Sequence, residues 1–158
     1  LMAGYSKFNA TIFCYANFTN ANFSKSCFTC ASFVSAYFTN AVFRNTIFKD
    51  ANFNSADFKY SRFRDVEFSN AIFDGIQLKH AITEGLLGFQ VISCQLNTSE
   101  ENRVVQYWPA LDIVTAGCFS GTLEELKKKI KETHKDNPDM RKKYNLVLDY
   151  IDAMVKLG

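Results

Sequence analysis

Cysteine and histidine are the residues of this chain best suited to chemistry, and they are few. Cys27 and Cys30 form a C-x-x-C pair, a spacing found in zinc sites. The chain has no second pair of this kind and no histidine close by, so the ligand set of a zinc site is incomplete. Phe28 stands between the two thiols on the repeat described below, which places them on different parts of one coil. The sequence therefore predicts no metal site.

The remaining cysteines and both histidines show no catalytic grouping. Five cysteines, an odd number, favour free thiols, and we expect Cys94 and Cys118 to pack as small buried hydrophobic residues. His80 is expected to face outward, and His134 to lie at a helix C-terminus, where a positive charge is favourable. Neither phosphate-binding motif, G-x-x-x-x-G-K or G-x-G-x-x-G, is present. These features predict a protein that is not an enzyme and holds no cofactor.

The element that must position the side chains of the first half is a five-residue repeat. Phenylalanine returns at every fifth position from Phe8 to Phe73, and Leu78 continues the series. A step of five residues turns an α-helix by about 140°, and an odd step along a strand alternates between its faces. Neither regular element keeps all these rings on one side, so the chain has to bend once in each unit. The period therefore predicts a coiled path with the rings stacked inside.

A second column of small residues supports this geometry. Ala, Ser or Thr stands two residues before each ring from Ser6 to Ser61, and the pattern then loosens. Positions two apart share a face of an extended backbone, so one large and one small side chain point inward in each unit. The other three positions are mostly polar, as a solvated exterior requires, and Asn and Asp suit the repeated turns.

Residues 16–18, 51–53 and 56–58 read Ala-Asn-Phe, Ala-Asn-Phe and Ala-Asp-Phe. They resemble the unit of the pentapeptide-repeat proteins, Ala-(Asp/Asn)-(Leu/Phe)-X-X, and the resemblance extends over roughly residues 6–83. It implies a right-handed, four-sided β-helix with four units in each coil and about four coils. We therefore expect a mainly β chain whose first domain is a β-helix at residues 1–83.

Residues 84–158 are expected to form a small capping module of strands and two helices, because an open coil exposes unpaired backbone groups. Short strands are predicted at 89–96, 103–107 and 111–115, with a surface turn at 97–102 between the first two. The segment 114–125 is similar to a C-terminal α/β module of some uncharacterised bacterial and phage-type repeat proteins, and this similarity carries no function.

The two predicted helices have clear start signals. Thr122 and Glu125 form a capping box, which predicts a helix of about 122–134. Asn137 before Pro138 is typical of a helix N-terminus and predicts a second helix of about 138–156. Two helices with a short joint form an αα-hairpin.

Charge and hydropathy limit the partners. The formal net charge is +2; residues 1–83 carry eight Lys or Arg against five Asp or Glu, or +3, and residues 84–158 carry ten against eleven, or −1. These balances argue against a nucleic-acid partner. No apolar run approaches the ~18 residues of a membrane span, and the start resembles a cut rather than a signal peptide. We therefore expect a cytoplasmic protein without a membrane contact.

Residues twenty apart stack in such a coil, so outward side chains form columns. Five basic residues, here called the basic stripe, gather towards the C-terminal end of the repeats: Arg44, Lys59, Arg62, Arg64 and Lys79. Alternatively, these five residues are solvated charges that only keep the protein soluble. Outward apolar residues form a second candidate contact surface, unless the C-terminal segment covers them: Ile12, Tyr15, Val34 and Ile72, with Cys14 beside them.

These features predict a non-catalytic binding or scaffold protein whose β-helical rod docks a macromolecular partner, in the first place a protein. The C-terminal helices are expected to cap the rod or to pair two chains into a homodimer. An alternative comes from the resemblance, because some pentapeptide-repeat proteins modulate DNA gyrase, a topoisomerase, by resembling duplex DNA in shape and negative charge. This chain departs from that pattern, since its repeat region is mildly basic and short.

Overall fold

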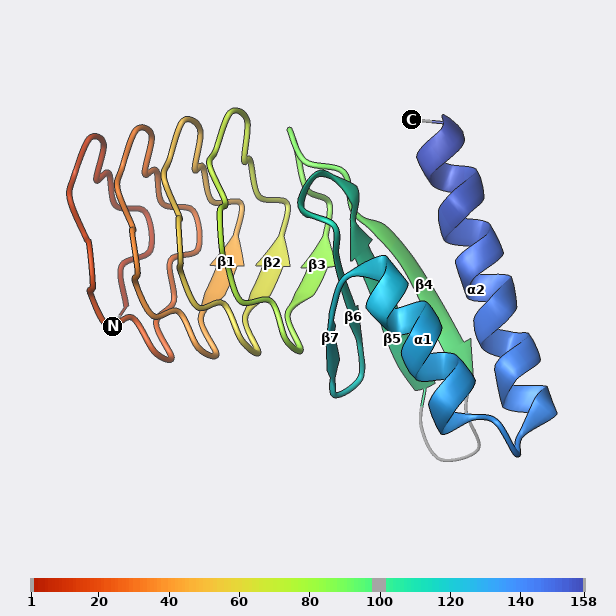
Figure 1. Cartoon of the computed structure of the whole chain (residues 1–158). Coiled ribbons are helices and arrows are strands. Elements are labelled where there is room, and N and C mark those ends of the chain that lie inside the picture. Colours follow the sequence, from red (N-terminus) through yellow and green to blue (C-terminus); the bar gives the residue numbers. More distant parts are fainter. Residues whose placement is uncertain (1, 98–101, 158) are drawn as a thin grey trace. The chain divides into compact units, whose positions relative to one another are not determined.

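The computed structural model describes residues 2–97 and 102–157 of the chain. The chain divides into two compact units, Leu1–Gln90 and Val91–Gly158 (Figure 1). Each unit is described by itself below.

The first unit is a parallel β-helix in which each coil takes twenty residues. Its named strands β1 (Val42–Arg44), β2 (Arg62–Arg64) and β3 (Ile82–Glu84) pair in parallel in the order β1-β2-β3. Isolated parallel bridges with the same spacing form the other sides, as between Lys7 and Cys27 or Asn17 and Tyr37. Figure 1 shows the resulting succession of similar coils up to β3. The coiled path expected from the five-residue period is confirmed.

A left-handed backbone conformation at every fifth residue turns the chain. Positive φ recurs from Tyr5 (63°) to Gly85 (64°), which gives four corners in each coil. Asn, Asp and Gly occupy several corners, but so do Ala10 and Tyr60, although this conformation costs an L-residue roughly 1–2 kcal/mol. Hydrogen bonds around each corner offset the cost: the N–H of Asn40 donates to the carbonyl of Lys59 in the next coil at 3.0 Å. The fold therefore fixes the corner more than the residue type does.

Stacked phenylalanine rings fill the interior. Rings twenty residues apart lie nearly parallel, as for Phe38 and Phe58, whose centroids are 4.9 Å apart with 5° between the planes. From Phe23 to Phe68 every ring of the series is at most 2% exposed. Phe8 and Phe13 are only half-buried, which corrects the expectation that all rings are enclosed. Each of these two has a stacked ring on one side alone.

The small inward column packs beside the rings as expected. From Ala21 to Val66 the residues of this column are buried, and the hydroxyl groups of its polar members in that range have acceptors. The hydroxyl of Thr46 donates to the Phe23 carbonyl at 3.0 Å, and that of Ser61 donates to the Phe58 carbonyl at 2.7 Å. A buried hydroxyl with a partner is tolerated, so Ser and Thr can replace Ala at this position.

Backbone pairing continues beyond residue 83, where the sequence repeat has already weakened. Glu67 bridges Leu87, and the N–H of Phe68 donates to the Leu87 carbonyl at 2.8 Å. Gly88 follows with φ +74°, and a Cβ there would lie 2.6 Å from the Cα of Ser69. Only glycine fits this close approach, which the hydrophobic pattern does not reveal.

The second unit contains a four-stranded antiparallel sheet and two helices. Its strands are β4 (Ile92–Asn97), β5 (Asn102–Trp108), β6 (Ile113–Ala116) and β7 (Phe119–Gly121), in the order β4-β5-β6-β7. A 3₁₀ turn, η1 (Pro109–Leu111), joins β5 to β6, and helices α1 (Leu123–Thr133) and α2 (Pro138–Leu157) follow. Strand β7 was not expected, and β4 starts later than residue 89. Within the predicted turn at 97–102, residues 98–101 lie outside the described residues.

The core of this unit lies between the sheet and the helices. Alternate residues of the strands, such as Val105 and Val114, are buried together with Leu126 and Ile130 of α1. Helix α2 contributes the buried side chains of Tyr144, Val147 and Ile151 to the same core. The spacing of three and four residues places these side chains on one face of α2, as the sequence pattern predicts.

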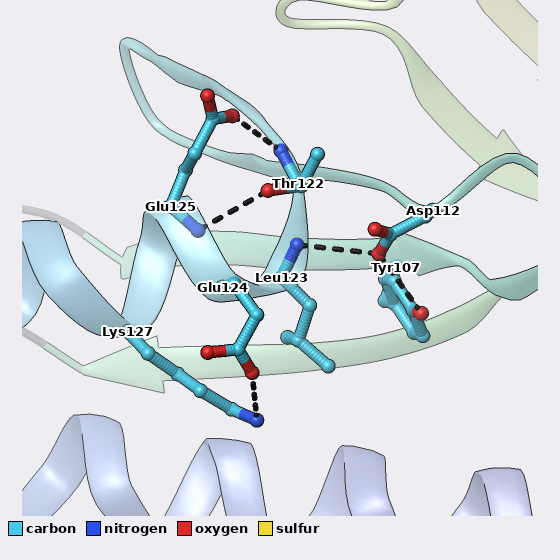
Figure 2. Close-up of polar contacts among 7 residues, drawn as sticks. All are labelled: Tyr107, Asp112, Thr122, Leu123, Glu124, Glu125 and Lys127. Carbon is cyan, nitrogen blue, oxygen red and sulfur yellow. Dashed lines mark hydrogen bonds and ion pairs between the residues drawn. The ribbon is translucent and has the colours of Figure 1, made fainter.

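A polar junction fixes the start of α1 (Figure 2). The capping box predicted at Thr122 is present: its hydroxyl accepts from the N–H of Glu125 at 3.2 Å, and the Glu125 carboxylate accepts from the N–H of Thr122 at 2.8 Å. Asp112 Oδ1 accepts from the N–H of Leu123 at 3.3 Å and from the Tyr107 hydroxyl at 3.2 Å. One carboxylate thus ties strand β5 to the N-terminus of α1, where a negative charge is favourable.

Phe48→Ala tests the stacked core. Phe48 is 0% exposed and stacks between Phe28 at 5.2 Å and Phe68 at 5.5 Å. We expect the substitution to lower the free energy of unfolding by about 3–5 kcal/mol, because it leaves a cavity in the ladder. Chemical denaturation followed by circular dichroism measures the change. Phe8→Ala is the control and should cost clearly less, since Phe8 is half-buried; equal losses would contradict the ladder.

Tyr107→Phe tests the polar junction through its pH dependence. Burial raises the pKa of Tyr107 above its ordinary value of 10.0, and the charge of Asp112 raises it further. A raised pKa in the folded state gives stability that is present below about pH 10 and is lost as the pH rises through the folded value. Without the hydroxyl, we expect a cost of about 1 kcal/mol at pH 7 and a shallower loss of stability above pH 10. Denaturation curves measured from neutral to alkaline pH that keep the same slope in both proteins would refute this.

Candidate interaction surfaces

The register of the β-helix places outward side chains in columns. In strands β1 to β3, Arg44 pairs with Arg64, and Arg64 pairs with Glu84. Arg62 lies in the neighbouring column between Val42 and Ile82. All three arginines are exposed. The three arginines therefore form a basic surface on this side of the β-helix, over strands β1 and β2.

Lys59 and Lys79 come from the preceding side of the coil. The N–H of Tyr60 donates to the carbonyl of Lys79 at 3.0 Å, so the two lysines lie in adjacent layers. Both are half-buried, and only the corner at Tyr60 and Ser61 separates Lys59 from Arg62 along the chain. The residues of the basic stripe thus occupy two neighbouring sides of the same coils.

Ion pairs neutralise part of the basic stripe. Lys59 Nζ lies 3.1 Å from Asp57 Oδ2, and Arg64 Nε lies 3.6 Å from Glu84 Oε2 and 3.7 Å from Asp65 Oδ2. In the part of the chain that the structure describes, Arg44, Arg62 and Lys79 form no ion pair. The positive charge available to a partner therefore resides mainly on these three.

An aromatic pair occupies one corner column, and the repeat pattern did not predict it. The rings of Tyr60 and His80 stack with centroids 4.7 Å apart and 12° between the planes. Both residues have positive φ, and Tyr60 is 50% exposed. His80 faces outward, as predicted. The sequence does contain the signal for this stack, because Tyr60 and His80 are twenty residues apart, which is the length of one coil.

The outward apolar residues form two groups instead of one surface. Bridges run from Ile12 to Ser32, on to Asn52, and then to Ile72, so two polar layers separate the two isoleucines. Ile12 is 76% exposed and Ile72 is 52% exposed. Tyr15 lies beside Val34, to whose carbonyl its N–H donates at 2.9 Å, near Ile12. The outward apolar residues therefore comprise an N-terminal group, with Ile72 apart from it.

The thiols do not assemble into a site in the first unit. Cys27 is half-buried with its Sγ 3.3 Å from Thr29 Oγ1, whereas Cys30 occupies an exposed corner with φ 58°. The two thiols of the C-x-x-C pair therefore lie on different parts of the coil, as expected. Among residues 2–97 and 102–157, no group of three or more potential ligands is arranged to hold a metal ion.

Cys118 is exposed, which corrects the expectation that it packs in the core. It lies in the tight turn between the paired strands β6 and β7, where Gly117 has φ 58°. Cys94 does pack against the core of the second unit, and burial raises the pKa of its thiol.

Cys118 and His134 line the same open cavity of about 210 Å³, whose walls are mainly the apolar side chains of Phe119, Leu126 and Ile130. His134 ends α1, as predicted, and its ring stacks on that of Tyr144 at 5.2 Å. No hydrogen bond of the described residues joins the thiol to the imidazole. The cavity therefore lacks the geometry of a nucleophile activated by a base.

None of the described helices is both long enough and apolar enough to cross a lipid bilayer.

A comparison with protein families identifies the repeats. The family model described as pentapeptide repeats, which spans eight copies, matches residues 6–40 and 36–75. Residues 6–75 therefore match the pentapeptide-repeat family, as the resemblance of the sequence indicated. No curated protein matches the chain.

Solved structures of pentapeptide-repeat proteins are similar to part of the chain. Rfr23 from the cyanobacterium Cyanothece 51142 is 11% identical and has a TM-score of 0.38 over 54% of this chain and 90% of its own. HetL from Nostoc sp., a protein involved in heterocyst differentiation, is 18% identical with a TM-score of 0.26 over 55% of this chain and 47% of its own. QnrB1, a plasmid-mediated fluoroquinolone resistance protein, is 19% identical with a TM-score of 0.35, and the match covers 54% of this chain and 55% of that one.

Proposed function

We propose that the protein is a non-catalytic scaffold whose right-handed, four-sided β-helix of about four coils docks an acidic segment of a protein partner on the basic stripe. The observation that carries this proposal is a set of exposed or half-buried cations that form no ion pair with any described residue, Arg44, Arg62 and Lys79. They lie in neighbouring columns of one unit. Residues 6–75 match the pentapeptide-repeat model, and the regular faces of solenoid repeats suit binding.

The β-helix supports such binding because it holds its surface rigidly. Successive layers are joined by backbone hydrogen bonds such as those from Arg62 to Ala41 and from Ile82 to Ser61, each 2.9 Å long. Layers repeat at roughly 4.8 Å, the distance between neighbouring strands of a sheet. The backbone beneath the charges is therefore already ordered, so docking requires only the ordering of side chains.

The stacked rings of Tyr60 and His80 add an apolar contact beside these charges. Tyrosine and arginine are enriched in protein interfaces because each combines a flat apolar face with hydrogen-bonding groups. A partner segment with acidic residues on either side of an apolar or aromatic residue fits this arrangement.

Duplex DNA fits the surface less well. Proteins that hold DNA through its backbone neutralise roughly six to ten phosphates, whereas three residues of the basic stripe lack an ion pair within residues 2–97 and 102–157. The alternative function, a gyrase modulator that mimics DNA, requires a negative surface. The exposed arginines over β1 and β2 oppose it.

Charge reversal tests the docking surface. We expect Arg44→Glu with Arg62→Glu to abolish retention of the acidic partner that the wild-type protein captures from a cell extract, because both unpaired arginines change sign. The matched control is Lys7→Glu with Lys49→Glu, which makes the same change of charge on another side of the β-helix. Equal loss in both variants would show non-specific attraction, and retention by the Arg44/Arg62 variant would reject the basic stripe as the docking surface.

A supercoiling assay distinguishes the proposed scaffold function from the alternative, a modulator of DNA gyrase. We expect DNA gyrase to supercoil a relaxed plasmid at an unchanged rate in the presence of micromolar protein, because the β-helix lacks the negative surface of a DNA mimic. Inhibition, or protection from a fluoroquinolone, would favour the gyrase modulator. A gel-shift measurement with the same plasmid shows whether any effect comes from direct binding to DNA.

A further inference from the structure

Helix α2 carries a second apolar row that the core of its unit does not use. The row consists of Leu146, Tyr150, Ala153 and Leu157, here called the exposed row. Leu146 is 62% exposed, Tyr150 43% and Leu157 81%, and Ala153 is exposed as well. Scattered apolar residues on a surface are common, but four that align along three turns of one helix form a continuous stripe.

The exposed row is distinct from the face that packs on the sheet. Tyr144, Val147 and Ile151 are buried, and Leu146 and Tyr150 each precede one of them by a single residue, which is about 100° around the helix. One apolar face is sufficient to cover one side of a sheet. Leu146 also borders an open cavity of about 220 Å³ beside Cys94 and Leu96 of β4 but stays 62% exposed, so the exposed row exceeds what the packing of its own unit requires.

The spacing of the exposed row is that of a coiled-coil seam. Steps of four, three and four residues separate its members, and a seam of this period packs against a second helix. Charged residues line the edge away from the sheet, where Asp149 and Lys156 lie seven residues apart. Charges at this position decide which helix pairs with which, and in which direction.

We propose that the exposed row is the interface with a second copy of this chain, paired in antiparallel order. In this order Leu146 packs on Leu157 of the partner subunit, and Tyr150 packs on the partner's Ala153, a large side chain against a small one. Two-fold symmetry repeats each contact. The pairing extends the homodimer expected from the sequence to named residues and a direction, and it does not depend on the basic stripe.

Charge complementarity favours this occupant and this order. Antiparallel pairing brings Asp149 beside the partner's Lys156, and the symmetry of the dimer forms the same pair a second time. A parallel pair would instead place Asp149 across from the partner's Met154, which packs against its own core. About three helical turns form a small interface, so the dimer should depend on protein concentration.

Sedimentation velocity over a concentration series tests the pairing on the full chain. We expect the wild type to shift from monomer to dimer as its concentration rises, and Tyr150→Asp to remain a monomer. Val155→Asp is the matched control, because Val155 is also 43% exposed but lies about 140° around the helix from Tyr150. A wild type that stays monomeric throughout, or a control that dissociates like Tyr150→Asp, would overturn the proposal. Circular dichroism confirms that each variant retains its helices.

A charge exchange tests the antiparallel order. Asp149→Lys and Lys156→Asp should each weaken the dimer at low salt, since each sets like charges against one another. The double variant exchanges the charges and should restore the dimer to near wild-type strength. Failure of the double variant to recover, with intact helix content, would contradict the antiparallel order.

Discussion

Backbone hydrogen bonds between residues nineteen or twenty-one apart hold the layers of the β-helix in register, and this register makes the aromatic core possible. Each ring stacks on the ring one layer away, as Phe48 does on Phe28 and Phe68. A shift of the chain by one residue would move every ring off its column and place polar residues inside. The same register that builds the core also fixes the columns outside it. The register of the layers therefore determines both the packing of the rings inside and the arrangement of the side chains outside.

The first half of the fold was predictable because its signal repeats. The period of five predicted the coil, and twenty-residue pairing followed from the family resemblance. What the repeat could not reveal depends on single positions: Gly88 is required by a close approach to Ser69, and Phe8, in the first coil, is only half-buried. In the second half, capping signals predicted both helices, whereas the three-residue strand β7 is too short to show a period.

The sequence predicted where the basic stripe lies but not which of its charges are available to a partner. Columns follow from the coil length, so Arg44 and Arg64 were expected to align. Whether a charge is available depends on its neighbours in space: Arg64 forms ion pairs with Glu84, one layer further along the same column, and with Asp65, the next residue in the chain. Residues of opposite sign in adjacent layers are therefore the feature to examine in any such repeat. A comparison of residues twenty apart also predicts that the ring of Tyr60 stacks on that of His80.

A repeat that determines its own fold leaves its outward residues free to vary, so these residues carry the specific information of the protein. The exposed row of α2 extends this reasoning to the second unit, because residues beyond those needed to cover the sheet indicate a further contact. If two chains pair there, each particle carries two basic stripes. A partner with repeated acidic segments could then bind both at once, and the second contact would benefit from the high local concentration created by the first. A weak docking surface would in this way gain affinity without additional residues on the β-helix.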